Sequence, residues 1–328
     1  MTEVAVLTAD DEPDLPGLDG LPDSVRVTHV RDEQALTDAL TRADILVVTD
    51  FRSGMIERCW PEKPSVRWVH ATSAGVDALM FPALRDSDIP VTNARGIFNR
   101  GIAEYVLGAI LLFAKDTMGN LNYQRLHRWQ HRETRLIDRQ RVLIVGAGSI
   151  GTTVGQLLNA AGLEVEGTAR TERTIEGFRK VHAQEDMMAV LPHVDYVVIT
   201  APLTPDTEGL FDRETFRAMK PSAHLINVGR GPIVASEALL AALEQGDIAG
   251  AALDVFEEEP LPENHPLWDK PNVMISAHMA GDFIGWWIPK PTGFAWWIAT
   301  PPWRWRASPN SAINSISPRV RSTVCRWR

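Results

Sequence analysis

Residues 141–151 read Arg-Val-Leu-Ile-Val-Gly-Ala-Gly-Ser-Ile-Gly, which joins an apolar run to three closely spaced glycines. Its first part, up to Val145, is mostly apolar and β-branched, which predicts a buried strand. Apolar residues at helical spacing follow as far as Ala161. The glycines therefore fall at a strand-to-helix turn, and in that context their spacing predicts a dinucleotide site with the pyrophosphate at the helix N-terminus.

Each position of the turn has its own expected role. We expect Gly146 to permit the tight turn, Gly148 to let the backbone approach a phosphate, and Gly151 to let the helix pack closely on the strand. Together with these glycines, Ser149 and Ile150 would present backbone N–H groups to the phosphates. The alternative is that the turn only connects two elements.

The residues after the second strand indicate which dinucleotide binds. A carboxylate about twenty residues beyond the glycines usually accepts a hydrogen bond from the ribose 2′-hydroxyl of NAD. Arg170 stands at that place here, followed by Thr171 and Arg173. A guanidinium pairs with a 2′-phosphate. The sequence therefore favours NADP, with NAD as the alternative if Glu164 or Glu166 serves the ribose.

Length and composition narrow the class of protein. A chain of 328 residues predicts about two domains. Its two cysteines, Cys59 and Cys325, give neither a disulfide framework nor a zinc ligand cluster, and no basic leader opens the chain. The longest apolar run, 105–114, is too short to span a bilayer. We expect a cytoplasmic protein that binds neither metal nor membrane, and the net charge of −9 argues against nucleic acid as a partner.

Apolar runs recur along the rest of the chain with the spacing of parallel strands. Before residue 98 they lie at 4–7, 45–48 and 66–70, separated by helix-compatible stretches such as 31–42. A long apolar-periodic helix is expected from Asn99 to Ala114. Beyond the turn and its second strand, strands are expected at 196–199, 224–228, 250–255 and 272–276. This alternation predicts an α/β fold with two doubly wound parallel-sheet domains, of which residues 1–98 form one and residues 99–283 the other.

Three chemically active side chains follow the last three of these strands, one after each. Arg230 comes just after one strand, Glu259 lies in the loop after the next, and His278 follows another. Ligands of doubly wound sheets bind beyond the carboxyl ends of the strands. We therefore expect the three side chains to converge on one edge of the sheet.

With these residues in view, the chain resembles the D-isomer-specific 2-hydroxyacid dehydrogenases, particularly their glyoxylate/hydroxypyruvate reductase-like members. The resemblance extends from about residue 40 to residue 283. Besides the glycine-rich turn, it rests on six stretches: Thr-Ser-Ala-Gly-Val-Asp at 72–77, Ala-Glu-Tyr at 103–105, Ala-Pro-Leu-Thr at 201–204, Ile-Asn-Val-Gly-Arg-Gly at 226–231, Leu-Asp-Val-Phe at 253–256 with Glu-Pro-Leu at 259–261, and Ser-Ala-His-Met-Ala-Gly at 276–281.

The resemblance implies an activity and an assembly. It implies two flavodoxin- or Rossmann-like domains around a cleft, with the substrate domain built from both chain ends. The implied reaction transfers a hydride from NADPH or NADH to a small 2-keto acid such as glyoxylate or hydroxypyruvate, giving the D-2-hydroxy acid. A homodimer through the nucleotide domain is also implied. The alternative from another class is a non-catalytic nucleotide sensor, similar to the family's corepressor relatives.

The three side chains suit the implied reaction. His278 would give the proton, because an imidazolium can do so near neutral pH. Glu259 would accept a hydrogen bond from the other ring nitrogen and favour the protonated ring. Arg230 would hold the substrate carboxylate in its planar fork and polarise the carbonyl. The alternative for Glu259 is a solvated acidic run at 257–259.

Further site residues follow from the resemblance alone. The backbone N–H groups of Ala74, Gly75 and Val76 would bind the substrate carboxylate. Asp254 would accept from the nicotinamide carboxamide, with a helix cap as its alternative. Asn99 and Arg100 would touch substrate, or Asn99 would cap the helix that follows it. The cofactor would further be lined by Pro202, Thr204, Val228 and Gly229, and substrate selectivity would lie with Phe51, Arg52 and Trp60.

Residues 284–328 depart from the resemblance. They hold six prolines, seven of the 11 tryptophans and no Asp or Glu, without sustained periodicity, where the family continues with a long amphipathic helix. Back-translated with G/C-rich codons and read one base earlier, 305–309 can encode Leu-Ala-Gly-Glu-Pro, which is similar to the family's usual ending. We therefore expect an atypical tail produced by a frameshift near codon 286, which resequencing would test. An aromatic, basic interaction segment or an inactive product are the alternatives.

Overall fold

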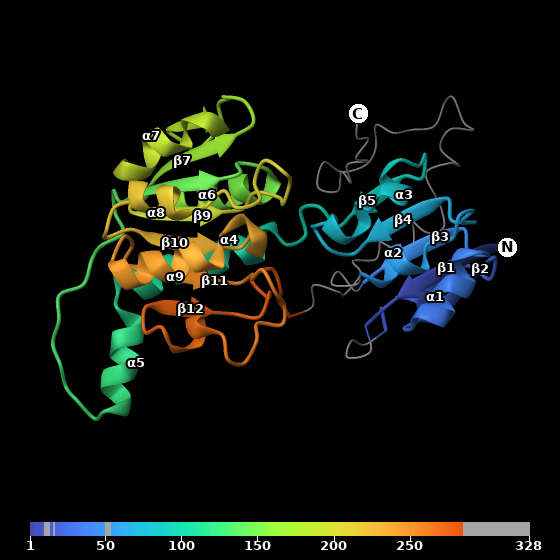
Figure 1. Cartoon of the computed structure of the whole chain (residues 1–328), viewed down its shortest axis with the longest axis horizontal. Coiled ribbons are helices and arrows are strands. Elements are labelled where there is room, and N and C mark those ends of the chain that lie inside the picture. The colour runs from blue at the N-terminus through green and yellow to red at the C-terminus, as the bar shows by residue number, and fades with distance from the viewer. Residues whose placement is uncertain (10–13, 16, 50–53, 285–328) are drawn as a thin grey trace. The chain divides into compact units, whose positions relative to one another are not determined.

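The computed structural model describes residues 1–9, 14–15, 17–49 and 54–284. These residues belong to two compact units, which divide between Ile97 and Phe98 (Figure 1). The expectations for Phe51 and Arg52 and for the tail at 285–328 lie outside the described residues.

The first unit is built on a five-stranded sheet in the order β2-β1-β3-β4-β5, and every neighbouring pair is parallel. The direction of winding reverses between β1 and β3, which makes the sheet doubly wound. The strands are β1 (Thr2–Leu7), β2 (Val25–Val30), β3 (Ile45–Val48), β4 (Trp68–Ala71) and β5 (Val91–Asn93). The helices are α1 (Glu33–Leu40), α2 (Met55–Cys59) and α3 (Pro82–Arg85), with short 3-10 turns η1 (Leu18–Gly20) and η2 (Asp77–Leu79).

The second unit is built on a seven-stranded parallel sheet in the order β12-β11-β10-β9-β6-β7-β8. Here the winding reverses between β6 and β9. The strands are β6 (Arg141–Val145), β7 (Glu164–Ala169), β8 (Lys180–Ala183), β9 (Tyr196–Ile199), β10 (His224–Asn227), β11 (Gly250–Leu253) and β12 (Val273–Ile275).

Helices cover the second sheet in two packed pairs. α4 packs on α6, and α8 packs on α9. The α-helices are α4 (Asn99–Ala114), α5 (Thr117–Arg125), α6 (Ser149–Ala160), α7 (Met187–Val190), α8 (Arg213–Ala218) and α9 (Ser236–Gln245). The 3-10 turns are η3 (Gln184–Asp186), η4 (Leu191–His193), η5 (Gly231–Ile233) and η6 (Pro266–Asp269).

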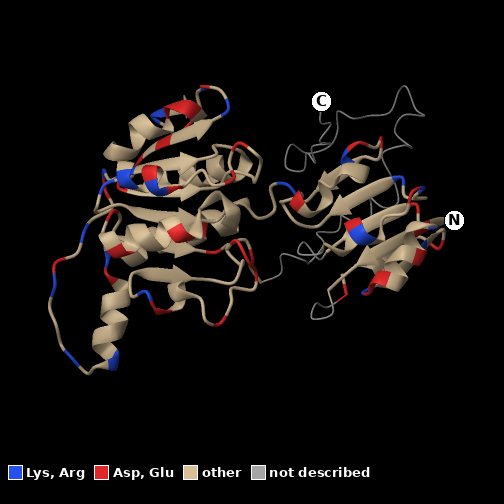
Figure 2. Cartoon of the chain, in the orientation of Figure 1, with Lys and Arg blue, Asp and Glu red and all other residues tan. Residues whose placement is uncertain are grey.

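The central strands are apolar because both of their faces are covered. Val142 to Val145 of β6 are each 0 % exposed. Alternate residues of β6, Leu143 and Val145, join one core with Phe216 and Leu239 of the α8 and α9 pair. β9, β10 and β11 contain no Asp, Glu, Lys or Arg, and the charged residues lie mostly on helices and loops (Figure 2). Burial on both faces explains the continuous apolar runs of the sequence.

The predicted fold class, two doubly wound parallel α/β sheets, is confirmed. β3, β6, β9 and α4 have the predicted bounds, and the other predicted strands differ by one or two residues at their ends. One local expectation is wrong: Phe98 and not Asn99 caps α4, because Asn99 already has helical backbone as the first residue of the helix. Within the described ranges, the structure holds no helix long and apolar enough to cross a membrane.

Candidate functional site

The register of the second sheet brings five strand ends to one edge. Val145 pairs with Ile199, Ile199 with Asn227, Asn227 with Leu253, and Leu253 with Ile275. Because all these strands are parallel, the residues that follow this row emerge side by side at the carboxyl edge of the sheet. The glycine-rich turn follows β6, and the loops that carry Arg230, Glu259 and His278 follow β10, β11 and β12. One edge therefore gathers the predicted cofactor turn and the three predicted catalytic side chains.

The glycine-rich turn lies beside the point where the winding of the sheet reverses. Gly146 has φ 97°, in the left-handed region, and a Cβ there would lie 2.6 Å from the Cα of Ala201. A Cβ at Gly151 would lie 2.3 Å from the carbonyl oxygen of Gly146. At Gly148, which caps α6, the nearest atom to a Cβ is 4.0 Å away, so this position opens onto free space. The turn thus exposes the N-terminal N–H groups of α6 where a pyrophosphate would fit.

Glu259 and His278 form a direct pair at the carboxyl edge. The Nδ1 of His278 lies 2.7 Å from the Oε2 of Glu259, and the side chains are 28 % and 26 % exposed. The other carboxylate oxygen accepts from the backbone N–H of Phe256 at 2.9 Å. Glu259 is therefore held at both oxygens, and it orients the imidazole of His278 through Nδ1.

The electrostatics of the pair favour an ionised carboxylate. Burial raises the pKa of Glu259, but the hydrogen bonds from His278 and Phe256 and the charges of His278 and Arg230 outweigh it, so that the pKa lies below its ordinary value. Arg230 follows β10, and its guanidinium donates to the carbonyl oxygen of Gly229 at 2.7 Å. A Cβ on Gly231 would lie 1.8 Å from the backbone of Phe256, so the loops after β10 and β11 are in close contact.

The residues after β7 place positive charge beside the glycine-rich turn. Arg170 is exposed immediately after the strand, and the guanidinium of Arg173 donates to the carbonyl oxygen of Ala147 within the turn. The two carboxylates of β7 are engaged elsewhere. Glu164 pairs with Arg179. Glu166 is 8 % exposed and accepts from Arg141 at 2.5 Å, with His182 at 2.7 Å.

Asp254 is 2 % exposed and holds the loop that carries His278. Its carboxylate accepts from the hydroxyl of Ser276 at 2.6 Å and from the backbone N–H groups of Met279 and Ala280, each at 2.9 Å. The predicted contact of Asp254 with a nicotinamide carboxamide stays a prediction. The anchoring role escapes the sequence because the partners lie more than twenty residues away.

Asn99 also has a role that its sequence position hides. Its side-chain amide donates to the hydroxyl and the carbonyl of Ser149 at 2.9 and 3.1 Å, and to the hydroxyl of Thr153 at 3.2 Å. α4 is thereby joined to the first turn of α6, beside the glycines. Arg100 is exposed and pairs with Glu104 at 2.5 Å.

The remaining predicted residues fall in both units. Thr204 is tied to Thr207 by backbone and side-chain hydrogen bonds, and a Cβ on Gly229 would lie 2.8 Å from the carbonyl of Ala201. Pro202, Thr204, Val228 and Gly229 thus follow β9 and β10 at the carboxyl edge, and Thr171 lies exposed after β7. In the first unit, Ala74, Gly75 and Val76 follow β4, and the carbonyls of Ala74 and Gly75 accept from Asn93 and Ser73. Trp60 packs edge-on against Phe81 at 5.3 Å.

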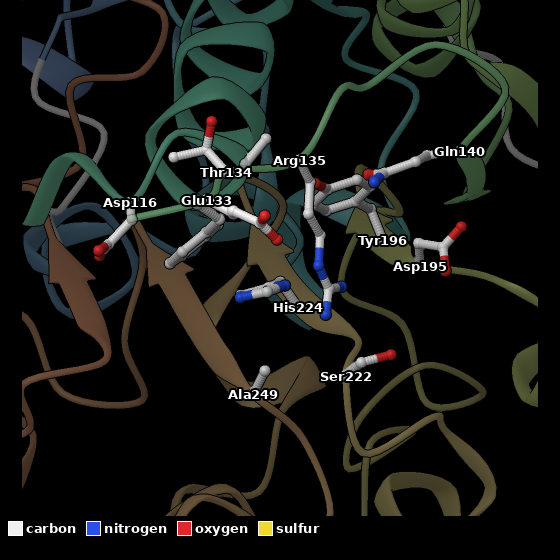
Figure 3. A pocket seen from close by; sticks show the side chains of 12 residues that line it. Asp116, Glu133, Thr134, Arg135, Gln140, Asp195, Tyr196, Ser222, His224 and Ala249 are labelled. Atoms are coloured by element: carbon white, nitrogen blue, oxygen red, sulfur yellow. The ribbon is translucent and has the colours of Figure 1, made fainter. Parts of the chain in front are cut away.

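A cavity of about 320 Å³ lies at the opposite edge of the second sheet (Figure 3). Its wall includes Tyr196 and His224, the first residues of β9 and β10, with Arg135 beside them. The His224 ring stacks on Phe113 at 4.3 Å, and burial, followed by the charge of Arg135, lowers the pKa of His224 to about 4. None of the predicted site residues lines this cavity, so we assign the chemistry to the carboxyl edge.

A nucleotide turn beside a histidine–carboxylate pair and an arginine defines a class of nicotinamide-dependent dehydrogenases. The family described as "D-isomer specific 2-hydroxyacid dehydrogenase, NAD binding domain" matches residues 107–280, which is over half of the chain, and the chain belongs to this family. It is an NAD(P)-dependent oxidoreductase. The predicted family, enzyme class and cofactor class are confirmed.

Relatives of known name agree with this assignment. A glyoxylate/hydroxypyruvate reductase A from Serratia proteamaculans is 33 % identical over 221 residues, which cover 66 % of this chain and 71 % of the relative. A D-isomer specific 2-hydroxyacid dehydrogenase family protein from Klebsiella pneumoniae has a similar structure, with TM-score 0.77, 30 % identity and coverage of 93 % and 94 %. An NADPH-dependent glyoxylate/hydroxypyruvate reductase from Sinorhizobium meliloti, solved with NADP and sulfate, gives TM-score 0.76, 27 % identity and coverage of 86 % and 90 %.

Proposed function

We propose that this protein is an NADPH-preferring reductase of small 2-keto acids, with glyoxylate or hydroxypyruvate as the first substrates and glycolate or a D-2-hydroxy acid as the products. The observation that carries the proposal is the 2.7 Å contact between His278 and Glu259 at the carboxyl edge, with the charge of Arg230 acting on the same carboxylate. The names of the relatives supply the substrate class.

The side chains of the site divide the work. Bound NADPH supplies the hydride. His278 donates a proton from Nε2 to the carbonyl oxygen. The resulting neutral ring keeps its proton on Nδ1, which donates a hydrogen bond to Glu259. Arg230 binds the carboxylate of the substrate and stabilises the negative charge that develops on the carbonyl oxygen. Glu259 fixes the orientation of the ring, so that the proton is aimed before the hydride arrives.

The preference for NADPH rests on the charges around the glycine-rich turn. Arg170 and Arg173 place two guanidinium groups after β7, and Arg173 contacts the turn itself. Glu164 and Glu166 are already engaged by basic partners. A 2′-phosphate would therefore meet cations, while a ribose hydroxyl would find no uncommitted carboxylate on β7.

The enzymatic proposal is tested by His278→Ala. We expect steady-state oxidation of NADPH by glyoxylate to fall by on the order of a hundredfold or more, because the proton donor is lost. The affinity for NADPH, measured by nucleotide fluorescence, should stay unchanged. Unaltered turnover in this variant would refute the role of His278. Binding of NADPH by the wild type without turnover of any 2-keto acid would favour the non-catalytic sensor.

The cofactor proposal is tested by Arg170→Ser, with Arg139→Ser as the matched control. Both changes remove one exposed arginine, but Arg139 lies before β6 and pairs with Asp138 at 3.8 Å. We expect kcat/KM for NADPH to fall about tenfold in Arg170→Ser, since one charge-assisted pair is lost, with little change for NADH. An equal loss for both cofactors in Arg170→Ser would contradict the proposal.

We further propose that two copies associate through an arm formed by residues 117–138. The arm consists of α5 and the segment after it, which extend from the sheet of the second unit (Figure 1). α5 buries none of its residues, and the arm exposes four large apolar side chains: Leu121 at 48 %, Leu126 at 52 %, Trp129 at 102 % and Leu136 at 75 %. Apolar residues gathered this way mark an interaction surface.

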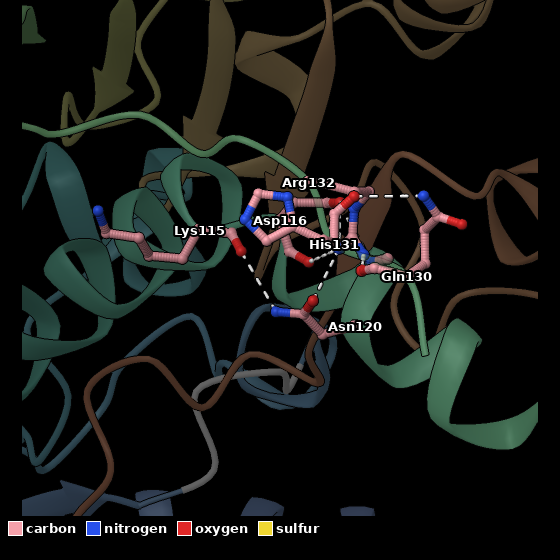
Figure 4. A network of polar contacts seen from close by, with 7 residues as sticks. Lys115, Asp116, Asn120, Gln130, His131 and Arg132 are labelled. Carbon is pink, nitrogen blue, oxygen red and sulfur yellow. Dashed lines mark hydrogen bonds and ion pairs between the residues drawn. The ribbon is translucent and has the colours of Figure 1, made fainter. Parts of the chain in front are cut away.

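Polar contacts hold the base of the arm in one shape (Figure 4). The guanidinium of Arg132 lies 2.6 Å from the carboxylate of Asp116 and donates to Asn120 at 2.7 Å. It also lies 4.7 Å from the ring centre of Tyr123. A pre-shaped arm loses less conformational entropy on association, which favours a second copy of the chain as its partner.

We also infer a cytoplasmic location. The support is the cysteine content: the chain has only two cysteines, and Cys59 is free and buried. A protein of this size without a disulfide framework is typical of a reducing compartment.

A further inference from the structure

A chain of hydrogen bonds runs from α4 to the end of β11. The hydroxyl groups of Tyr105 and Ser276 are 2.6 Å apart, and the hydroxyl of Ser276 donates to the carboxylate of Asp254 at 2.6 Å. A carboxylate only accepts, so the single hydroxyl proton of Ser276 points to Asp254. The hydroxyl of Tyr105 must then donate to Ser276. The direction of the whole chain is therefore set from tyrosine to serine to aspartate.

Asp254 in turn fixes the backbone on both sides of His278. Its carboxylate accepts from the N–H groups of Met279 and Ala280, and its backbone carbonyl accepts from the N–H of His278 at 2.8 Å. His278 has φ 52°, in the left-handed region that residues other than glycine rarely adopt. The loop keeps this conformation because its surroundings hold it, and Asp254 makes most of those contacts.

α4 forms the wall behind the same loop. Gly101 and Tyr105 are four residues apart and lie on one face of the helix. A Cβ on Gly101 would lie 2.9 Å from the carbonyl oxygen of Gly281, so helix and loop are in close contact there. Burial raises the pKa of Tyr105 to about 12, with the hydrogen bond to Ser276 opposing and the charge of Asp254 adding to the shift. Tyr105 is therefore a permanent donor at neutral pH.

We propose that Tyr105 and Ser276 are positioning residues for the proton donor: through Asp254 they hold the loop 276–281 in the conformation that places the His278 ring against Glu259. This proposal rests on the proposed reductase function. Neither side chain touches substrate in this role. Besides Glu259, the charged groups that act around the histidine are Asp282 and Arg230.

The first test is Tyr105→Phe, which removes the donor and keeps the ring. We expect kcat for glyoxylate reduction to fall on the order of tenfold, because small displacements of a catalytic group are costly. The dissociation constant for NADPH should stay within about twofold, since the variant leaves the glycine-rich turn and the carboxylate of Asp254 in place. The falling limb of the pH profile of kcat/KM should also move, because the contact between His278 and Glu259 is loosened.

Tyr196→Phe is the matched control. Burial, with the charge of Asp195, also raises the pKa of Tyr196 to about 12, but Tyr196 stands at the opposite edge of the sheet. Its substitution removes the same hydroxyl group without touching the loop, so kcat and the pH profile should not change. An equal loss of kcat in both variants would mean that any buried hydroxyl matters, and the positioning role would be overturned.

A second pair of variants tests the middle of the chain. Ser276→Ala removes both hydrogen bonds and should lower kcat at least as far as Tyr105→Phe, whereas Ser276→Thr keeps a hydroxyl and should restore most of it. In the double variant Tyr105→Phe/Ser276→Ala, the loss should equal that of Ser276→Ala alone, because both act through one chain. Additive losses would overturn the proposal, and so would a Ser276→Ala enzyme with normal kcat.

His278→Ala separates the two proposals. If it abolishes turnover while Tyr105→Phe and Ser276→Ala leave kcat and the pH profile intact, the reductase function stands and the positioning role fails. If His278→Ala retains turnover, the role of His278 as proton donor fails, and the positioning role fails with it. A wild type that binds NADPH but reduces no 2-keto acid would overturn the proposed function itself. If Tyr105→Phe does not fold, the comparison of Ser276→Ala with Ser276→Thr decides.

Discussion

At the scale of single residues, the surroundings of Glu259 determine its charge, and that charge bears on the mechanism. Its pKa lies below the ordinary value even though burial opposes this, so it is ionised throughout the neutral range. A neutral amide at this position would accept a hydrogen bond but would not stabilise a positive charge on His278. The charge of Glu259 therefore matters as well as its position.

We predict that Glu259→Gln lowers kcat for glyoxylate reduction by on the order of a hundredfold at neutral pH. Glu257→Gln is the control, since Glu257 belongs to the same acidic run but accepts from the N–H of Ser236 at 3.3 Å and not from His278. Similar effects of both changes would support a solvated acidic run instead.

Buried histidines give a second prediction at this scale. Burial lowers the pKa of His70 and His224 to about 4, from an ordinary value of 6.5. Between these two values the unfolded chain binds more protons than the folded protein, so the free energy of unfolding falls as pH drops from 7 toward 4. At pH 5 the carboxylates are still largely ionised and the histidines dominate the change.

His224→Gln should therefore reduce the difference in unfolding free energy between pH 7 and pH 5 by roughly 1 kcal/mol, as measured by urea denaturation. His193→Gln is the control, because His193 is exposed and a change there should leave the difference as it is. A full pH dependence retained in His224→Gln would show that its neutral state contributes nothing to stability.

At the scale of elements, the position of α6 depends on Gly151. A Cβ there would lie 2.3 Å from the carbonyl oxygen of Gly146 and 2.7 Å from the hydroxyl of Thr200, so the helix would have to move. We predict that Gly151→Ala destabilises the protein by about 1–3 kcal/mol and weakens NADPH binding on the order of tenfold. Thermal unfolding and a nucleotide titration measure the two effects.

Gly108→Ala is the matched control for a glycine in a helix. A Cβ on Gly108 of α4 would meet nothing within 4 Å, so alanine should add about 0.5–1 kcal/mol through helix propensity alone and leave nucleotide affinity as it was. The opposite signs of the two changes separate close packing from propensity. A stabilising Gly151→Ala would contradict the role assigned to this turn.

The sequence predicts the elements whose apolar pattern is long or continuous and misses those without such a pattern. β6 and α4 are predicted to the residue, because β6 is an almost continuously buried run and α4 buries apolar residues at helical spacing. β8 reads Lys-Val-His-Ala and α5 reads Thr-Met-Gly-Asn-Leu-Asn-Tyr-Gln-Arg, and neither carries a periodic apolar face. The edge position of β8 and the exposure of α5 explain why their sequences are polar.

The candidate site divides in the same way. The order of Arg230, Glu259 and His278 after successive strands is enough to place them at one edge, because strand register does the rest. The bond between Tyr105 and Ser276 spans 171 residues, and no local pattern predicts such a pair. The anchoring contacts of Asp254 and the link of Asn99 to α6 are hidden for the same reason.

At the scale of the whole molecule, the arm at 117–138 predicts the oligomeric state. We expect the wild type to be a dimer in light scattering coupled to size-exclusion chromatography. Trp129→Ser should shift it toward the monomer, since a fully exposed aromatic residue is the type that contributes most at interfaces.

Trp268→Ser is the control for the arm. Trp268 is also exposed, at 51 %, but it lies in η6 and its indole N–H donates to the carbonyl of Pro262 at 2.9 Å. This variant should remain dimeric. A wild type that is monomeric at tens of micromolar would end the proposal, and so would a Trp129→Ser variant that associates as strongly as the wild type.

The first two turns of α4 connect two parts of the candidate site. Asn99 holds the first turn of α6 at 2.9 Å, Gly101 lies against Gly281, and Tyr105 bonds to Ser276 at 2.6 Å. α4 thus contacts both the helix whose N-terminus would bind the phosphates and the loop that carries the proton donor. A rotation of α4 by a few degrees would shift both the glycine-rich turn and the loop of His278. Cofactor affinity and the position of the proton donor are therefore coupled. Since α4 begins two residues after Ile97, the peptide chain connects the first unit directly to the N-terminal end of this helix.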